Sequence, residues 1–215
     1  MSFMPIVIEK SGENERSYDL SSRMLKDRII TIDGEFNDTM AYLTKMQLQW
    51  LDSQSSEAIT VYISSPGGSV LAGLGIKDIM ENCRSDISII CTSLAASMGC
   101  YTLSTAGTPG KRFITKRSQV MCHQVSSSTQ GVLSDQQISL RQSEKLNDLL
   151  MGEIAESVGV SIEQLLSDCS RDLWLNAEEA LNYGTKGFVD GVLLGEQNLN
   201  GQYKVLYRDG KEGWI

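Results

Sequence analysis

The sequence predicts an α/β domain with a largely parallel sheet. Two runs rich in β-branched residues, Ile59–Ile63 and Ile87–Cys91, have the composition of buried strands. Each run leads into a turn of small residues and then into a predicted helix, and this repeated order of strand, turn and helix is typical of parallel sheets. The chain has 215 residues and shows neither a linker nor a convincing internal repeat, so we expect one domain.

In the first part of the chain, the clearest helix signal begins at Asn37. Asparagine is a favourable N-cap, and the apolar residues between Met40 and Leu51 recur at helical spacing. The elements predicted for this part, in order, are a flexible arm or loop over residues 1–17, a short helix over 21–26, a strand over 28–32, a helix from 37 to 51, a strand over 59–63, a helix over 69–82, a strand over 87–91, a turn at 95–96 and a helix over 97–105.

The second part contains one long helix, predicted over about 134–158 from the helical spacing of apolar residues between Ile138 and Val158. Gly184 is suited to end a short helix, and Asp209-Gly210 is a hairpin-turn signal. The other predicted elements are strands over 112–114, 119–123 and 188–194, a loop over 124–131, short helices over 162–166 and 177–183, and a small hairpin in the tail. We therefore divide the chain into an arm (1–17), one domain (18–194) and a C-terminal tail (195–215).

Composition and charge disfavour several classes of protein. The formal net charge is -8 without a basic block, which disfavours nucleic acid and anionic membranes as partners. The five cysteines form no CxxC motif and have no histidine or acidic cluster around them, so we expect no metal site and a reducing compartment. We see no signal-peptide pattern and no apolar stretch long enough to span a bilayer, and we expect a cytoplasmic protein.

The chain contains one histidine, His123, and a serine, Ser97, at a predicted strand-to-helix turn. A serine at such a turn is well placed to act as a nucleophile. Imidazole is the side chain whose ordinary pKa suits removal of a proton near neutral pH. Each residue also has a structural interpretation, as a helix-starting serine and as a hydrogen-bonded core histidine, and for either residue alone that interpretation is the default.

A glycine turn, Ser65-Pro-Gly-Gly-Ser69, separates another predicted strand from its helix. The turn does not fit a phosphate loop, because it contains no Gly-Lys pair, and the two pairs elsewhere, Gly110-Lys111 and Gly210-Lys211, are not followed by serine or threonine. It does not fit a dinucleotide fingerprint either, because Gly73-Leu-Gly75 continues as Ile-Lys-Asp. An oxyanion hole fits better, since it requires only backbone donors at a tight turn. A purely structural glycine turn is the alternative.

Two further assignments complete the candidate site. Cys91 or Cys100 could replace Ser97 as nucleophile, but Cys122 should not reach His123, because consecutive strand side chains point to opposite faces. The acid that orients His123 must come from the aspartates and glutamates. Asp172 lies just ahead of apolar residues in a predicted loop between helices, where a carboxylate can be partly buried beside an imidazole; a solvated surface charge is the alternative.

The chain resembles the proteolytic subunit of the Clp protease over about residues 5–194. The landmarks that match in order are Glu-Arg-Ser-Tyr-Asp-Leu (15–20), Ser-Pro-Gly-Gly-Ser (65–69), Ala-Ala-Ser-Met-Gly (95–99), Gly-Lys-Arg-Phe (110–113), Met-Cys-His-Gln (121–124) and Arg-Asp-Leu-Trp-Leu-Asn-Ala-Glu-Glu-Ala-Leu-Asn-Tyr-Gly (171–184). Each motif is weak alone. Their joint order and spacing are specific.

The resemblance implies a crotonase-like (ClpP-type) α/β fold of stacked βαβ units with a protruding long helix. It implies that Ser97 is the nucleophile, His123 the general base and Asp172 the orienting acid, with the N–H groups of Gly68 and Met98 as oxyanion hole. It further implies seven-membered rings stacked in pairs around a chamber, in which unfolded polypeptides are cleaved through an acyl-enzyme. The chain itself would need no cofactor, because an AAA+ Clp ATPase partner would use the ATP.

Some residues depart from the family pattern. Residues 125–131 replace a proline and glycines after His-Gln, Ser170 replaces an acidic residue, residues 185–187 are additional, and the tail beyond Leu194 has no counterpart in the pattern.

Two other functions share the fold: a non-catalytic ring subunit, which typically lacks triad members, and an acyl-CoA enzyme of the crotonase type. The presence of all three triad candidates favours the serine peptidase.

Overall fold

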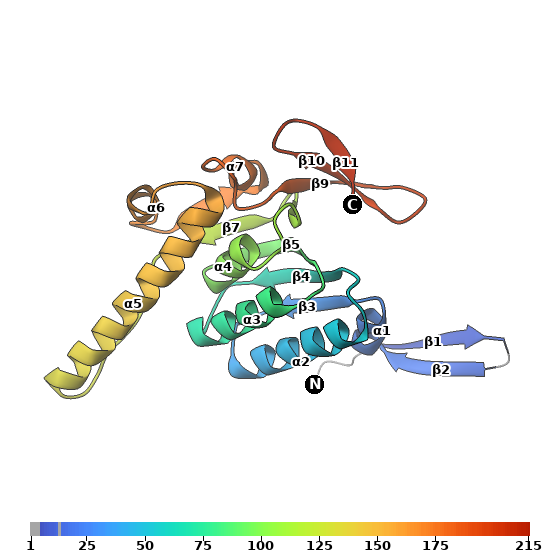
Figure 1. The fold of residues 1–215 in the computed structure, drawn as a ribbon, viewed down its shortest axis with the longest axis horizontal. Coiled ribbons are helices and arrows are strands. Elements are labelled where there is room, and N and C mark those ends of the chain that lie inside the picture. Colours follow the sequence, from blue (N-terminus) through green and yellow to red (C-terminus); the bar gives the residue numbers. More distant parts are fainter. Residues whose placement is uncertain (1–4, 13) are drawn as a thin grey trace.

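The computed structural model describes residues 5–12 and 14–215, and a nine-stranded sheet organises most of them (Figure 1). The strands follow the order β11-β10-β9-β6-β5-β4-β3, while β7 pairs with β5 and β8 with β7. These strands are β3 (Ile29–Asp33), β4 (Ile59–Ser65), β5 (Ile87–Ala96), β6 (Arg112–Thr115), β7 (Gln119–Cys122), β8 (Leu173–Asn176), β9 (Gly191–Gln197), β10 (Tyr203–Tyr207) and β11 (Glu212–Trp214). Pairing from β3 to β6, and of β6 with β9, is parallel, which confirms the predicted fold class.

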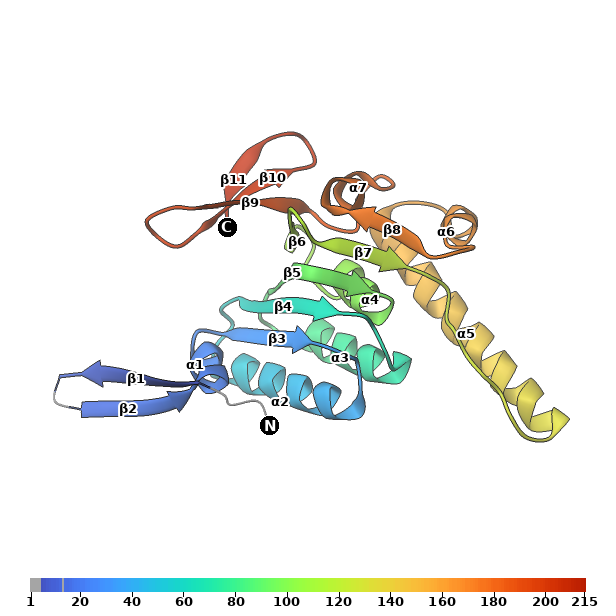
Figure 2. The ribbon, with the colours of Figure 1, turned by 180° about the vertical axis from the view of Figure 1, so that it is seen from behind.

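The helices of the described chain are α1 (Leu20–Lys26), α2 (Asp38–Gln54), α3 (Val70–Asn82), α4 (Met98–Thr105), α5 (Leu133–Val158), α6 (Ile162–Asp168) and α7 (Ala177–Asn182). Of these, α2, α3 and α4 cover one face of the parallel strands (Figure 1 and Figure 2). The predicted cap of α2 is present, because Asn37 accepts the N–H of Met40. Ser69, at the start of the helix predicted over 69–82, caps α3 by accepting the N–H of Ala72. On β4, alternate residues are fully buried against these helices: Ile59, Val61 and Ile63.

Strand β5 is longer than predicted and joins two parts of the sheet. Its first half pairs with β6, with Cys91 opposite Ile114, and its second half pairs with β7, with Ala95 opposite Val120. The prediction of a turn at residues 95–96 is therefore wrong, because β7 and the end of β4 supply ladder partners there. The consequence for function is that β5 ends directly before Ser97.

Helix α5 projects away from the body of the molecule (Figure 1). Its buried residues belong to its C-terminal half and include Leu150, Met151 and Ile154, whereas Ile138 is exposed in the N-terminal half. The helix ends at Gly159, whose φ of 75° is the left-handed conformation that glycine adopts most easily. The protruding long helix is confirmed.

Strands β1 (Ile6–Ser11) and β2 (Asn14–Asp19) pair antiparallel, where a flexible arm or loop was predicted. Residues 1–4 and 13 of the predicted arm lie outside the described residues. Ion pairs join Glu9 of β1 to Arg23 and Lys26 of α1, so the hairpin is tied to the helix that follows. The strands were not predicted because many residues of this segment are polar. Strand β2 also crosses the expected boundary between the arm and the domain at 17/18.

The tail forms the predicted hairpin, with Asp209-Gly210 in the turn between β10 and β11. Strand β10 also pairs with β9, which runs to Gln197 and crosses the expected boundary at 194/195. A second, smaller apolar cluster lies between the tail and the sheet, formed by Ile90, Phe113, Leu193, Val205, Tyr62, Tyr203, Tyr207 and Ile215. The tail therefore extends the sheet instead of forming a separate appendage.

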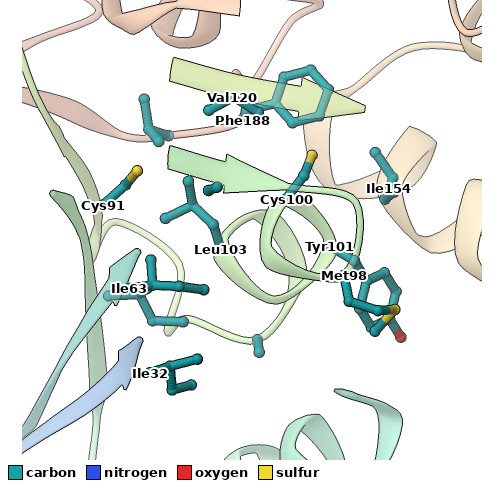
Figure 3. Close-up of a cluster of buried hydrophobic side chains, with 14 of the residues drawn as sticks. Ile32, Ile63, Cys91, Met98, Cys100, Tyr101, Leu103, Val120, Ile154 and Phe188 are labelled. Atoms are coloured by element: carbon teal, nitrogen blue, oxygen red, sulfur yellow. The ribbon is translucent and has the colours of Figure 1, made fainter. Parts of the chain in front are cut away.

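The main core surrounds α4, the helix that follows Ser97 (Figure 3). Cys100 and Leu103 of α4 are fully buried, and Tyr101 is 1% exposed. The core thus holds α4 from several sides, which fixes the backbone at its N-terminus.

Candidate active site

Ser97 lies between β5 and α4 in a strained conformation, with φ 54° and ψ -118°. Among the described non-glycine residues, only Ser97 and Arg28 have a positive φ. The N–H of Ser97 donates to the carbonyl of Met121 (2.8 Å), and its carbonyl accepts the N–H of Tyr101 (2.9 Å). A strained strand-to-helix turn directs a serine hydroxyl away from the sheet, which is a geometry that nucleophilic serines use.

The glycine turn after β4 packs directly on Ser97. A Cβ added to Gly67 would lie 2.5 Å from the Cβ of Ser97, and one added to Gly68 would lie 2.4 Å from the carbonyl oxygen of Phe36. Both glycines also have a positive φ, of 98° and 142°. The close approach explains why this turn needs two glycines.

The two expected oxyanion donors meet at one cavity. Gly68 and Met98 both line it, together with Ser97. In the described part of the chain, no hydrogen bond uses the N–H of Gly68 or of Met98. Two free backbone donors beside a serine hydroxyl are the arrangement that an oxyanion hole requires.

His123 follows the last residue of β7 and lines the same cavity as Ser97. Its position follows from sheet register, because Ala96 is paired with Met121 at the end of the β5–β7 ladder. Cys122 points the opposite way, into the core, and is 1% exposed. The alternation predicted for these two residues is therefore present.

Asp172 lies opposite His123 across the antiparallel β7–β8 pair, one step beyond the last paired residues, Cys122 and Leu173. Strand β8 is absent from the sequence-based prediction, which had placed a loop here. Asp172 is exposed and does not line the cavity. Among the described residues, no hydrogen bond joins Ser97 to His123 or His123 to Asp172. The three residues are thus adjacent in register but not connected in the isolated chain.

The cavity at Ser97 has a volume of about 60 Å³, and its lining includes several apolar side chains. These are Val70, Val125, Leu150, Met151 and Ile154. They can contact an apolar side chain of a bound ligand while the backbone donors contact a carbonyl oxygen.

Cysteine does not compete with Ser97 as nucleophile. Cys91 and Cys100 are fully buried and do not line the cavity. Burial raises the pKa of Cys91, and a hydrogen bond to Cys100, together with burial, raises that of Cys122. A thiol with a raised pKa is a poor nucleophile near neutral pH.

A model of the Clp protease family matches residues 11–196 of the chain. The chain belongs to the Clp protease family. It is also 42% identical over 200 residues to a protein from Ligilactobacillus salivarius (strain UCC118) named the ATP-dependent Clp protease proteolytic subunit. That alignment covers 93% of this chain and 100% of the relative. The prediction of a Clp-type peptidase is confirmed, and the comparisons offer no support for the non-catalytic alternative.

Sequence reasoning missed a polar cluster behind the site of this Clp-family chain. The hydroxyl of Tyr101, which lines the cavity, donates to Glu153 of α5 (2.5 Å), and Lys77 of α3 pairs with Glu153 (3.1 Å) and Glu81 (2.5 Å). Burial opposes the charge on Lys77, but hydrogen bonds to Glu81 and Glu153 outweigh it and raise the pKa of Lys77. The cluster joins α3, α4 and α5, and because these helices are separate in sequence, its residues form no motif.

The structure also positions the segment in which this chain departs from the Clp pattern. Residues 123–130 lie between β7 and α5 without regular secondary structure. Two bonds hold the start of the segment: the N–H of Val125 donates to Asn147 (3.0 Å), and the amide of Gln124 donates to the carbonyl of Cys169 (3.3 Å).

No helix among the described residues is long and apolar enough to cross a membrane.

Proposed function

We propose that the chain is a serine endopeptidase, the proteolytic subunit of an ATP-dependent Clp protease. The observation that carries this proposal is the convergence of Ser97, His123 and the N–H groups of Gly68 and Met98 on one cavity. Family membership supports the hydrolytic reaction, and this geometry supports serine as the nucleophile.

In the proposed reaction, the hydroxyl oxygen of Ser97 attacks the carbonyl carbon of a peptide bond while His123 takes the hydroxyl proton. The N–H groups of Gly68 and Met98 donate to the oxyanion. His123 then gives the proton to the leaving amine, and an acyl-enzyme forms on Ser97. Water, deprotonated by the same imidazole, attacks the ester carbonyl; His123 returns that proton to Ser97 as the acid leaves.

Asp172 is the proposed partner of His123. A carboxylate there would hold the imidazole in the required tautomer and stabilise the imidazolium. Because Asp172 is exposed and has no bond to His123 in the isolated chain, the proposal includes a closing movement on assembly. The assembly would be of seven-membered rings stacked in pairs, with fourteen subunits.

The proposed partner is an AAA+ Clp ATPase, as the name of the bacterial relative suggests. The chain would use no cofactor, and the partner would hydrolyse ATP to unfold substrates. Small peptides would then be cleaved without nucleotide, whereas folded proteins would need the ATPase. We propose a cytoplasmic location for this system.

Labelling with a fluorophosphonate, followed by peptide mapping, tests the nucleophile. The expected result is one modified peptide containing Ser97, with no labelling of Ser97→Ala and normal labelling of Cys100→Ala. Label at another residue, or persistent label in Ser97→Ala, would overturn the assignment. Binding of acyl-CoA without any labelling would favour the crotonase-type alternative.

A further inference from the structure

Because His123 makes no side-chain hydrogen bond in the described part of the chain, its position depends on its backbone. That backbone leaves the sheet at Cys122, where the ladder with β8 ends. The residues that follow have no ladder of their own. Contacts made by the segment around His123 must therefore fix the position of the imidazole ring relative to Ser97.

Asn147 supplies the first fixed point. Its side-chain oxygen accepts the N–H of Val125, two residues after His123, at 3.0 Å. Asn147 lies three and four residues before Leu150 and Met151, so it shares their face of α5, and these two residues line the cavity. The bond therefore joins the segment after His123 to the helix that contributes Leu150 and Met151 to the lining of the same cavity.

Gln124 supplies the second fixed point. Its side-chain amide donates to the carbonyl of Cys169 at 3.3 Å. Cys169 is 2% exposed and precedes Asp172 by three residues. The bond links the residue after His123 to the segment that carries Asp172.

We propose that Asn147 is a positioning residue for peptide hydrolysis, which holds His123 at the distance from Ser97 that proton transfer requires. The inference rests on the proposed function. Proton transfer requires the two heavy atoms to approach to about 2.6–3.2 Å. A displacement of about 1 Å near the reacting groups can reduce turnover about 100-fold. Gln124 supports the same segment from the side of Asp172.

The test compares two substitutions of similar size. Asn147→Asp keeps an oxygen that accepts the N–H of Val125, whereas Asn147→Leu removes it. Gln142→Leu, at an exposed position on the same helix, controls for general effects on α5. We expect Asn147→Leu to reduce kcat and the rate of fluorophosphonate labelling about 10- to 100-fold with little change in KM, and to speed amide exchange at residues 123–126. Asn147→Asp and Gln142→Leu should stay within about three-fold of the native chain.

The outcomes separate this inference from the proposed function. If the native chain is not labelled at Ser97, both fail. If the native chain is labelled and Asn147→Leu is labelled at the same rate, only the positioning role fails. Equal losses in Asn147→Asp and Asn147→Leu, or a rise in KM alone, would also overturn it.

A second pair of variants keeps the inference testable if Asn147→Leu does not fold. Gln124→Met removes the donor to Cys169, whereas Gln124→Lys keeps one. We expect slower labelling and faster amide exchange at residues 123–126 in Gln124→Met than in Gln124→Lys. Identical behaviour of the two would contradict positioning by this segment.

Discussion

His123 and Asp172 face each other across the end of the β7–β8 pair, one register step beyond Cys122 and Leu173. Antiparallel neighbours at such a step lie close enough for their side chains to meet. The sheet therefore brings the proposed base and acid together from positions 49 residues apart in sequence. The backbone thus places the two residues opposite each other, and the proposed reaction requires their side chains to meet.

The first prediction concerns this pair. Asp172→Asn should reduce peptide turnover about 10³- to 10⁴-fold, because an amide can favour the wrong tautomer of His123 and cannot stabilise an imidazolium. Asp168→Asn, on the neighbouring α6, serves as the control. Steady-state peptide hydrolysis and circular dichroism would be measured together. Near-native turnover in folded Asp172→Asn would place the orienting acid elsewhere.

The second prediction concerns pH. Because the chain has one histidine, kcat/KM for a small peptide should rise with pH along a single limb. The physical reason is that His123 must be neutral to accept the proton of Ser97. The same limb should appear in the rate of fluorophosphonate labelling. Two ascending limbs, or a flat profile from pH 5 to 8, would show that another group is the base.

The third prediction concerns the glycine turn. Gly67→Ala should abolish activity, because the added Cβ would lie 2.5 Å from the Cβ of Ser97 and 2.9 Å from the carbonyl oxygen of Ala96. The positive φ of 98° adds strain, so we expect a loss of about 1–3 kcal/mol in the free energy of unfolding. Gly12→Ala is the matched control, since Gly12 also has a positive φ but open space around it. Urea unfolding and peptide hydrolysis would be measured for both variants, and equal effects would contradict the contact with Ser97.

The fourth prediction concerns the attachment of the tail at alkaline pH. Burial, followed by a hydrogen bond with Tyr203, raises the pKa of Tyr62 from 10.0 to about 12. The contribution of Tyr62 to the free energy of unfolding should therefore be constant below about pH 10 and fall between pH 10 and 12, where Tyr62 ionises only in the unfolded chain. Tyr62→Phe should make this fall shallower, whereas Tyr42→Phe, at an exposed site on α2, should not. Urea midpoints at pH 8, 10 and 11 would check this, and identical slopes in native chain and Tyr62→Phe would contradict it.

The fifth prediction concerns assembly. The resemblance implies an acidic residue before Arg171 that pairs across the ring interface, and this chain has Ser170 there. Because serine has no carboxylate, position 170 offers no ion-pair partner to an arginine. Both Ser170 and Arg171 are exposed in the isolated chain. We expect activity to fall on dilution as double rings separate, and Ser170→Glu to shift the population toward double rings. Sedimentation velocity would measure this. Stable fourteen-subunit particles at nanomolar-scale concentration, unchanged in Ser170→Glu, would contradict it.

Sequence alone predicted the elements that carry strong local signals. Asn37, Ser69 and Gly159 mark helix ends that are independent of the rest of the fold, and β-branched runs mark β4 and the first half of β5. It also placed Ser97 and His123 at one site through their motifs, and the structure brings both to one cavity.

The remaining features depend on pairing between distant segments. Residues 94–96 and 173–176 become strands because β7 lies between them, and neither run is long enough to be recognised alone. Strand β2 is exposed at five of its six positions, so it lacks the alternation that identifies a half-buried strand. Asn147 and Gln124 act through backbone groups of distant residues, which leave no motif.

Strand β8 has one neighbour, β7, and forms an edge of its part of the sheet. Local opening of such an edge costs less free energy than unfolding of the whole domain. Opening of β8 would carry Asp172 away from its register position opposite His123, while most of the main core lies on other elements. Peptidase activity would thus be lost at a lower temperature than that at which the domain unfolds. The stability of the four-residue strand β8 would set the temperature up to which the chain cleaves peptides.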